Sequence, residues 1–156
     1  KEIQKIAGCY LNAELTEDKY KDALSNIMTD WTFGIHALAL LEQNKENSYG
    51  YFFNEPSPIF DGRLGAYHAS ELPYIFGSYH KKAFRDFCSE NASRISNIFQ
   101  LSWTEFAKTG SPASDLLEWK SYDKDRSIAF INSNPKIKNY NYIKRIKLLN
   151  ESKINY

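Results

Sequence analysis

The residue with the clearest setting for chemistry is His68, one of three histidines in the sequence. It is expected on a loop, rich in proline and glycine, that follows an aromatic, strand-like run at residues 48–53. Loops after the carboxyl ends of parallel strands are where α/β proteins place their sites. Gly65 permits a tight backbone approach just before the histidine. Two interpretations of His68 remain open from these residues, a general base and a hydrogen-bonded structural histidine.

Glu71, three residues after His68, also admits two interpretations. It could orient the imidazole as the acid of a triad, or it could be a structural carboxylate bonded to backbone amides or a basic partner. Together with His80 the pair could suggest a metal site. The helix that this spacing requires is interrupted by Pro73, and no further ligand stands out. We therefore expect no metal and no cofactor.

The sequence offers no serine nucleophile of the usual hydrolase type. None of its seven glycines begins a Gly-x-Ser-x-Gly elbow, and no glycine run suggests an oxyanion loop. The two cysteines, Cys9 and Cys88, lie far apart on the apolar sides of helical patterns, so both are expected to be small core residues. A single disulfide between them would fit an exported protein.

The elements that must position His68 follow from hydrophobic spacing. Helical periodicity predicts helices over residues 3–11, 20–28, 33–41 and 84–106, the second with Thr16 as its N-cap and the last ending at Gly110. The helix 33–41 is apolar almost throughout, so we expect it to be buried on most of its surface. Strands are predicted at residues 48–53, in a central position, and at 127–132, while residues 142–150 suit either a helix or a strand.

This order of elements fits an α/β layer arrangement, with helices packed on a partial and mostly parallel sheet. A lone buried strand cannot form a complete sheet, and the sequence begins at Lys1 without an initiator methionine. We therefore expect residues 1–156 to form a single partial domain, whose remaining strands come from residues upstream.

Composition excludes two classes of partner. The chain carries 20 basic and 19 acidic residues, which argues against a nucleic-acid-binding surface. No apolar run approaches the length of a membrane span. These features leave the compartment open, cytoplasmic or exported.

Several segments, in order, resemble type-B carboxylesterases, the family of cholinesterases and bacterial para-nitrobenzyl esterases. Residues 65–77, Gly-Ala-Tyr-His-Ala-Ser-Glu-Leu-Pro-Tyr-Ile-Phe-Gly, resemble the family's histidine segment. Residues 29–33 resemble its Thr-Asp-x-x-Phe helix start, and residues 103–112 its Trp-x-x-Phe-Ala-x-x-Gly-x-Pro segment. Trp119 and Tyr122 match its Trp-Pro-x-Tyr, although Lys120 replaces the proline. The resemblance covers roughly residues 20–132.

The resemblance implies the C-terminal portion of an α/β-hydrolase fold, a Ser-His-Glu triad and small-molecule esters as substrates. His68 matches the family's histidine, and the family pattern gives Glu71 a structural role. In this family the serine and the acid precede the histidine by more than the 67 residues available here. We therefore expect an upstream half of the fold, or self-association, to cover the exposed apolar surface. A non-catalytic remnant or a protein-binding module, like the family's adhesion members, is the alternative.

Overall fold

The computed structural model describes residues 8–10, 17–123 and 125–139. Contacts divide the chain into two compact units, residues 1–44 with 140–156, and residues 45–139. The single partial domain over residues 1–156 stays a prediction. The predicted helix at 3–11 lies largely outside the described residues, as do Thr16 and residues 142–150. In the part of the chain that the structure describes, no helix combines the length and apolar character needed to cross a membrane.

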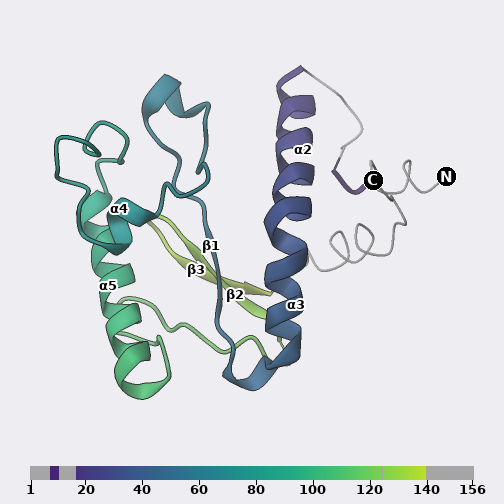
Figure 1. The fold of residues 1–156 in the computed structure, drawn as a ribbon, viewed down its shortest axis with the longest axis vertical. Coiled ribbons are helices and arrows are strands. Elements are labelled where there is room, and N and C mark those ends of the chain that lie inside the picture. The colour runs from purple at the N-terminus through teal and green to yellow at the C-terminus, as the bar shows by residue number, and fades with distance from the viewer. Residues whose placement is uncertain (1–7, 11–16, 124, 140–156) are drawn as a thin grey trace. The chain divides into compact units, whose positions relative to one another are not determined.

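The first unit contains helix α2 (Glu17–Thr29), a five-residue π-helical segment (Asp30–Gly34) and helix α3 (Ile35–Gln43) (Figure 1). The helices predicted at 20–28 and 33–41 are confirmed. They join without a break, because Thr29 and Gly34 both keep right-handed helical dihedrals. At the junction the buried carboxylate of Asp30 accepts a hydrogen bond of 2.7 Å from the Tyr10 hydroxyl. This bond satisfies a polar group that would be costly to bury alone.

Two expectations of burial in this unit are wrong. Of the predicted helix at 33–41 only Leu38 is buried, while Phe33 is exposed and Leu40 has 67% of its surface exposed. Cys9 is exposed as well, and it is a free thiol. A helix that is apolar all round needs partners on every side, and in this structure α3 buries one side only.

The second unit is built on a three-stranded sheet of β1 (Gly50–Phe53), β2 (Ser127–Ile131) and β3 (Lys136–Asn139), in that order. β1 pairs with β2 in parallel, and β2 pairs with β3 antiparallel. Both predicted strands are confirmed, whereas β3 was not predicted. In the described sheet β1 lies at an edge, on the side where the sequence predicts strands from upstream residues, so its central position in a larger sheet stays a prediction. Sequence pattern identifies a buried strand but not which strands flank it.

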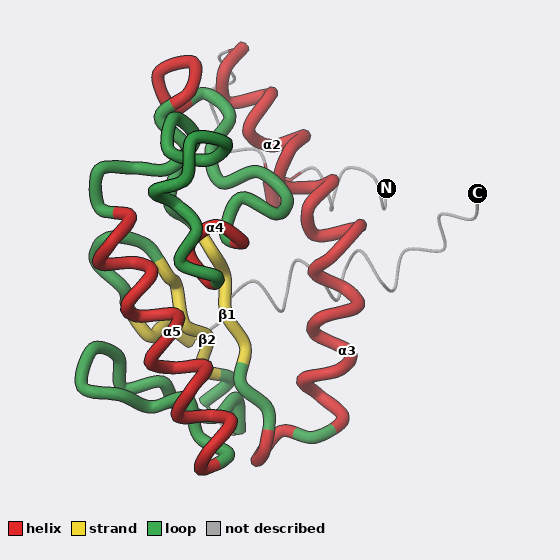
Figure 2. The backbone as a smooth tube through the Cα atoms, turned by 60° about the vertical axis from the view of Figure 1, so that its left-hand side comes forward, coloured by secondary structure: helices red, strands yellow, loops and turns green. Residues whose placement is uncertain are grey.

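Helix α5 (Ala92–Thr109) runs alongside the sheet (Figure 2). It ends as predicted at Gly110, which takes the left-handed conformation with a φ of 79°. The predicted start at residue 84 is eight residues too early, because residues 78–91 form turns. Two side-chain bonds hold those turns: the Ser57 hydroxyl donates to the Phe87 carbonyl, and the Ser89 amide donates to the Tyr74 hydroxyl. Such bonds compete with helix formation.

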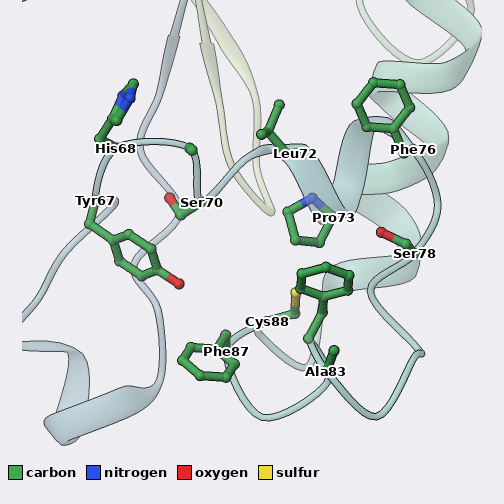
Figure 3. Close-up of a pocket in the computed structure, with 12 residues that line it drawn as sticks. Tyr67, His68, Ser70, Leu72, Pro73, Phe76, Ser78, Ala83, Phe87 and Cys88 are labelled. Carbon is green, nitrogen blue, oxygen red and sulfur yellow. The ribbon is translucent and has the colours of Figure 1, made fainter.

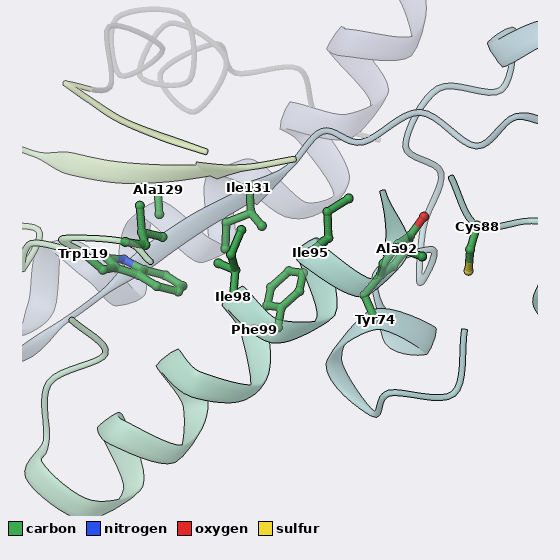
Figure 4. Close-up of a cluster of buried hydrophobic side chains, with 10 residues drawn as sticks. Tyr74, Cys88, Ala92, Ile95, Ile98, Phe99, Trp119, Ala129 and Ile131 are labelled. Carbon is green, nitrogen blue, oxygen red and sulfur yellow. The ribbon is translucent and has the colours of Figure 1, made fainter. Parts of the chain in front are cut away.

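The core of this unit lies between α5 and the sheet (Figure 4). Phe99 is its centre, and its ring lies 5.4–5.9 Å from the rings of Tyr51, Phe53 and Trp103. The indole of Trp119 donates a 3.2 Å hydrogen bond to the Gly50 carbonyl, so the core is tied to the start of β1. Phe53, at the carboxyl end of β1 from which the His68 loop departs, packs against Phe99 of α5, so packing holds that end as well.

Candidate active site

His68 lies on a loop after β1, as the sequence predicts, and within that loop it belongs to a turn. The chain leaves β1 at Phe53, passes through a 3₁₀ turn (Ile59–Gly62) and reaches His68 just before the short helix α4 (Leu72–Ile75). The Ser57 amide donates to the Gly65 carbonyl at 3.0 Å and closes the loop. His68 is therefore presented by a closed loop that ends in a helix, and its side chain is exposed.

Positive φ angles, and not a close approach, explain the backbone around His68. Gly65 has a φ of 58°, and a Cβ placed on it would meet no atom within 4 Å. The expected tight approach at Gly65 is thus wrong, and glycine is favoured there for its dihedral angle. Ala69 has a φ of 66°, a conformation that costs free energy in a residue with a Cβ. It reverses the chain so that the Ser70 amide donates to the Tyr67 carbonyl at 3.0 Å.

His68 stands at the rim of a cavity of about 450 Å³. The walls are largely apolar and include Leu72, Phe76, Phe84 and Phe87. In Figure 3 the ring of Tyr67 points towards the cavity, whereas the His68 ring stands at the rim and points outward. A cavity of this size and lining suits an apolar organic group, with the imidazole at its mouth.

Neither serine nor cysteine near His68 is set up as a nucleophile. Cys88 lines the cavity and is buried, as expected for it; burial raises the pKa of its thiol more than the Tyr74 hydroxyl lowers it. Since the thiolate is the nucleophile, a raised pKa leaves Cys88 unreactive at neutral pH. The Ser70 hydroxyl is buried without a hydrogen-bond partner, so His68 does not activate it.

The two tyrosines that flank the histidine segment have different roles. Tyr67 lines the cavity. Tyr74 is buried in the core: its ring lies 5.4 Å from that of Phe53, and its carbonyl accepts a 2.7 Å hydrogen bond from the Ser96 hydroxyl. Burial raises the pKa of Tyr74 to about 12, so the phenol stays protonated at neutral pH. Tyr74 therefore packs and does not shape the cavity.

Glu71 is the N-cap residue before α4, and its backbone carbonyl accepts hydrogen bonds from the Tyr74 and Ile75 amides. The pKa of Tyr51, on β1, is raised for two reasons. The larger is burial of the phenol, and the smaller is the negative charge of Glu71. The carboxylate therefore lies close enough to β1 to influence the Tyr51 hydroxyl. The structural role that the family pattern gives Glu71 stays a prediction.

The other two histidines of the sequence belong to different elements. His36 is exposed on α3, and His80 is exposed in the turns that follow α4. Among the residues that the structure describes, no three histidine, cysteine or acidic side chains gather as metal ligands would. Sequence reasoning missed Phe84 and Phe87 as cavity walls because it placed both on a helix. The polar run Ser89-Glu90-Asn91, ahead of the true helix start, was the available signal.

The model of the carboxylesterase family matches residues 2–149. This chain belongs to the carboxylesterase family. Para-nitrobenzyl esterase of Bacillus subtilis is 26% identical over 122 residues, which are 72% of this chain and 24% of that protein. Bile salt-activated lipase of Bos taurus is 32% identical over 106 residues, or 62% of this chain and 17% of that protein. The chain thus spans about a quarter or less of these two relatives.

Solved structures agree on the fold. A carboxylesterase of Geobacillus stearothermophilus superposes with a TM-score of 0.69 and 19% identity, covering 94% of this chain and 31% of that one. The expected α/β class is confirmed, and the partial sheet with its helices is consistent with a C-terminal portion of the α/β-hydrolase fold. The described part of the sheet is mixed, with one parallel and one antiparallel pair.

Proposed function

We propose that this carboxylesterase-family chain takes part in ester hydrolysis by supplying the catalytic histidine, His68, to a nucleophilic serine outside this sequence. The observation that carries the proposal is the setting of His68, on a closed loop after β1 and at the mouth of an apolar cavity. Its motif, from Gly65 to Gly77, supports the same role by family resemblance.

In the proposed reaction the imidazole accepts the serine proton as the serine oxygen attacks the ester carbonyl. The imidazolium then gives that proton to the departing alkoxide, which leaves as an alcohol, and the acyl group stays bonded to the serine as an acyl-enzyme. Water then attacks the acyl-enzyme while the same imidazole takes its proton, and the imidazolium gives that proton to the serine oxygen as the acid departs. The cavity beside His68 would hold an apolar acyl or alcohol group, and a carboxylate other than Glu71 would orient the ring.

The purified chain alone is expected not to hydrolyse p-nitrophenyl acetate faster than an equal concentration of imidazole. An imidazole without a nucleophile and an oxyanion hole lacks the cooperative unit of triad catalysis. The measurement is the initial release of p-nitrophenol over a range of substrate concentrations. Saturable turnover that a serine-directed phosphonate abolishes would show that this chain holds a nucleophile of its own.

The alternative function is a non-catalytic binding module of the same fold. Exposed apolar side chains on α2 and α3, among them Tyr20, Leu24, Met28 and Leu40, favour it, because such surfaces often mark interaction sites. A chimera distinguishes the two functions. In it, this chain replaces the matching segment of the Bacillus subtilis esterase. A folded chimera with His68-dependent esterase activity supports the catalytic function, and a folded, inactive one supports the module.

A further inference from the structure

The cavity beside His68 is built by one continuous stretch of the chain. Every residue that lines it falls between Tyr67 and Cys88. Hydrogen bonds within the stretch hold it, such as that from the Ser78 amide to the Pro73 carbonyl at 2.8 Å. The walls of the cavity therefore come from this chain alone, whatever strands other residues add to the sheet.

Tyr67 brings a hydroxyl to these largely apolar walls. Figure 3 shows its ring directed into the cavity, while the His68 ring points outward. The Tyr67 side chain keeps 37% of its surface exposed, so a molecule in the cavity can reach it. No residue in the part of the chain that the structure describes makes a hydrogen bond to its hydroxyl. A phenol hydroxyl without a protein partner bonds to water or to a ligand.

The other polar side chains of the lining are less well placed to meet a polar atom of a ligand. The Ser70 hydroxyl is fully buried, out of contact with a molecule in the cavity. The Cys88 thiol is a weak donor on a buried residue. Ser78 lies on the opposite side of the cavity from Tyr67 (Figure 3). A polar atom bound at the end nearest His68 therefore meets the Tyr67 hydroxyl.

The Tyr67 hydroxyl makes the cavity unequal towards ligands of the same shape. A hydrocarbon group that fills the cavity displaces water from this hydroxyl and leaves it without a hydrogen bond, which costs free energy. A group of the same shape with a carbonyl or ether oxygen at that position accepts the hydrogen bond and avoids the loss. A site built around such a hydrogen bond discriminates more strongly than an apolar wall does.

We propose that Tyr67 determines the specificity of this cavity, which takes an apolar group bearing a hydrogen-bond acceptor in preference to a hydrocarbon of the same shape. The inference rests on the proposed function, because it names the class of ester that the cavity favours. The acyl or alcohol part of such an ester is apolar and carries a carbonyl or ether oxygen of its own. The test measures binding and needs no esterase activity, so its result and the result for His68 are independent.

Acetophenone and α-methylstyrene are matched probes, because a CH2 group in the second replaces the carbonyl oxygen of the first. Each is titrated into the purified full chain, and the NMR shifts of the Phe84 and Phe87 amides give the dissociation constant. Tyr67→Phe should weaken the binding of acetophenone, which loses its donor, and should tighten that of α-methylstyrene, which no longer buries an unpaired hydroxyl. The ratio of the two dissociation constants should change about 10-fold.

Opposite changes for the two probes distinguish a hydrogen bond from packing, since a general loss of packing would weaken both. Tighter binding of α-methylstyrene also shows that the Tyr67→Phe chain is folded. Tyr79→Phe is the matched control, because it removes a tyrosine hydroxyl outside the cavity lining, and it should leave the ratio unchanged. A wild-type chain whose cavity amides respond to neither probe would overturn the proposal. So would a Tyr67→Phe chain that keeps the wild-type ratio.

Discussion

In the chimera of this chain with the Bacillus subtilis esterase, His68→Ala is expected to lower kcat/KM for p-nitrophenyl acetate about 10³-fold or more. The attacking serine loses its base, and the leaving alkoxide loses its acid, so both halves of the reaction slow down. The loss should fall mainly on kcat, because the imidazole acts on the transition state and the cavity walls that bind substrate stay in place.

Two variants of the same chimera serve as controls for that result. His80→Ala removes the other imidazole of the second unit, which is exposed in the turns after α4, and it should leave kcat/KM unchanged. Glu71→Gln should lower kcat/KM less than His68→Ala, and mainly by impairing folding, since we assign Glu71 a structural role. Circular dichroism separates the two causes. An active His68→Ala chimera would remove the catalytic assignment. A folded Glu71→Gln chimera as inactive as His68→Ala would show that Glu71 orients the imidazole.

The largest expected effect on stability comes from Phe99→Ala, at about 3–5 kcal/mol. The Phe99 side chain is fully buried, and it touches β1 through Tyr51 and Phe53 and its own helix through Trp103. Alanine would leave a cavity between α5 and the sheet, which rigid surroundings fill only in part. For a domain whose free energy of unfolding is about 5–15 kcal/mol, this loss is a large fraction of the whole.

Urea unfolding at a fixed protein concentration, followed by tryptophan fluorescence, measures this loss. Leu101→Ala is the matched control, because Leu101 lies two residues away on α5 with 44% of its surface exposed. Its cost should stay within about 0.5 kcal/mol. Equal costs for the two variants would mean that α5 does not pack on the sheet through Phe99.

The sequence predicted local elements well wherever one residue pattern decides the outcome. The aromatic run before Asn54 predicts β1, and Gly110 predicts the end of α5, since its left-handed conformation favours glycine. The start of α5 was misplaced because Phe84 and Phe87 continue the helical spacing. Ser57 and Tyr74, distant in sequence, hold that segment in turns instead. β3 escaped prediction because its sequence Lys-Ile-Lys-Asn is short and largely polar.

The site was predictable to the extent that its motif is contiguous. The position of His68 on a loop after β1 followed from the sequence, and so did the burial of Cys88. The cavity did not, because it brings α4 together with Phe84 and Phe87 of the following turns. Which strands flank β1 in a larger sheet was equally beyond a local pattern, since it depends on residues distant in sequence.

The most direct test of the central claim locates the nucleophile that His68 serves. The chimera is treated with a fluorophosphonate, and the adduct is found by mass spectrometry of its peptides. We expect the adduct on a serine of the esterase-derived part, with a labelling rate that falls about 10³-fold in His68→Ala and stays unchanged in His80→Ala. An adduct on a serine of this chain, such as Ser70, would contradict the proposal that His68 serves a serine outside it. A labelling rate that His68→Ala leaves unchanged would contradict the proposal as well.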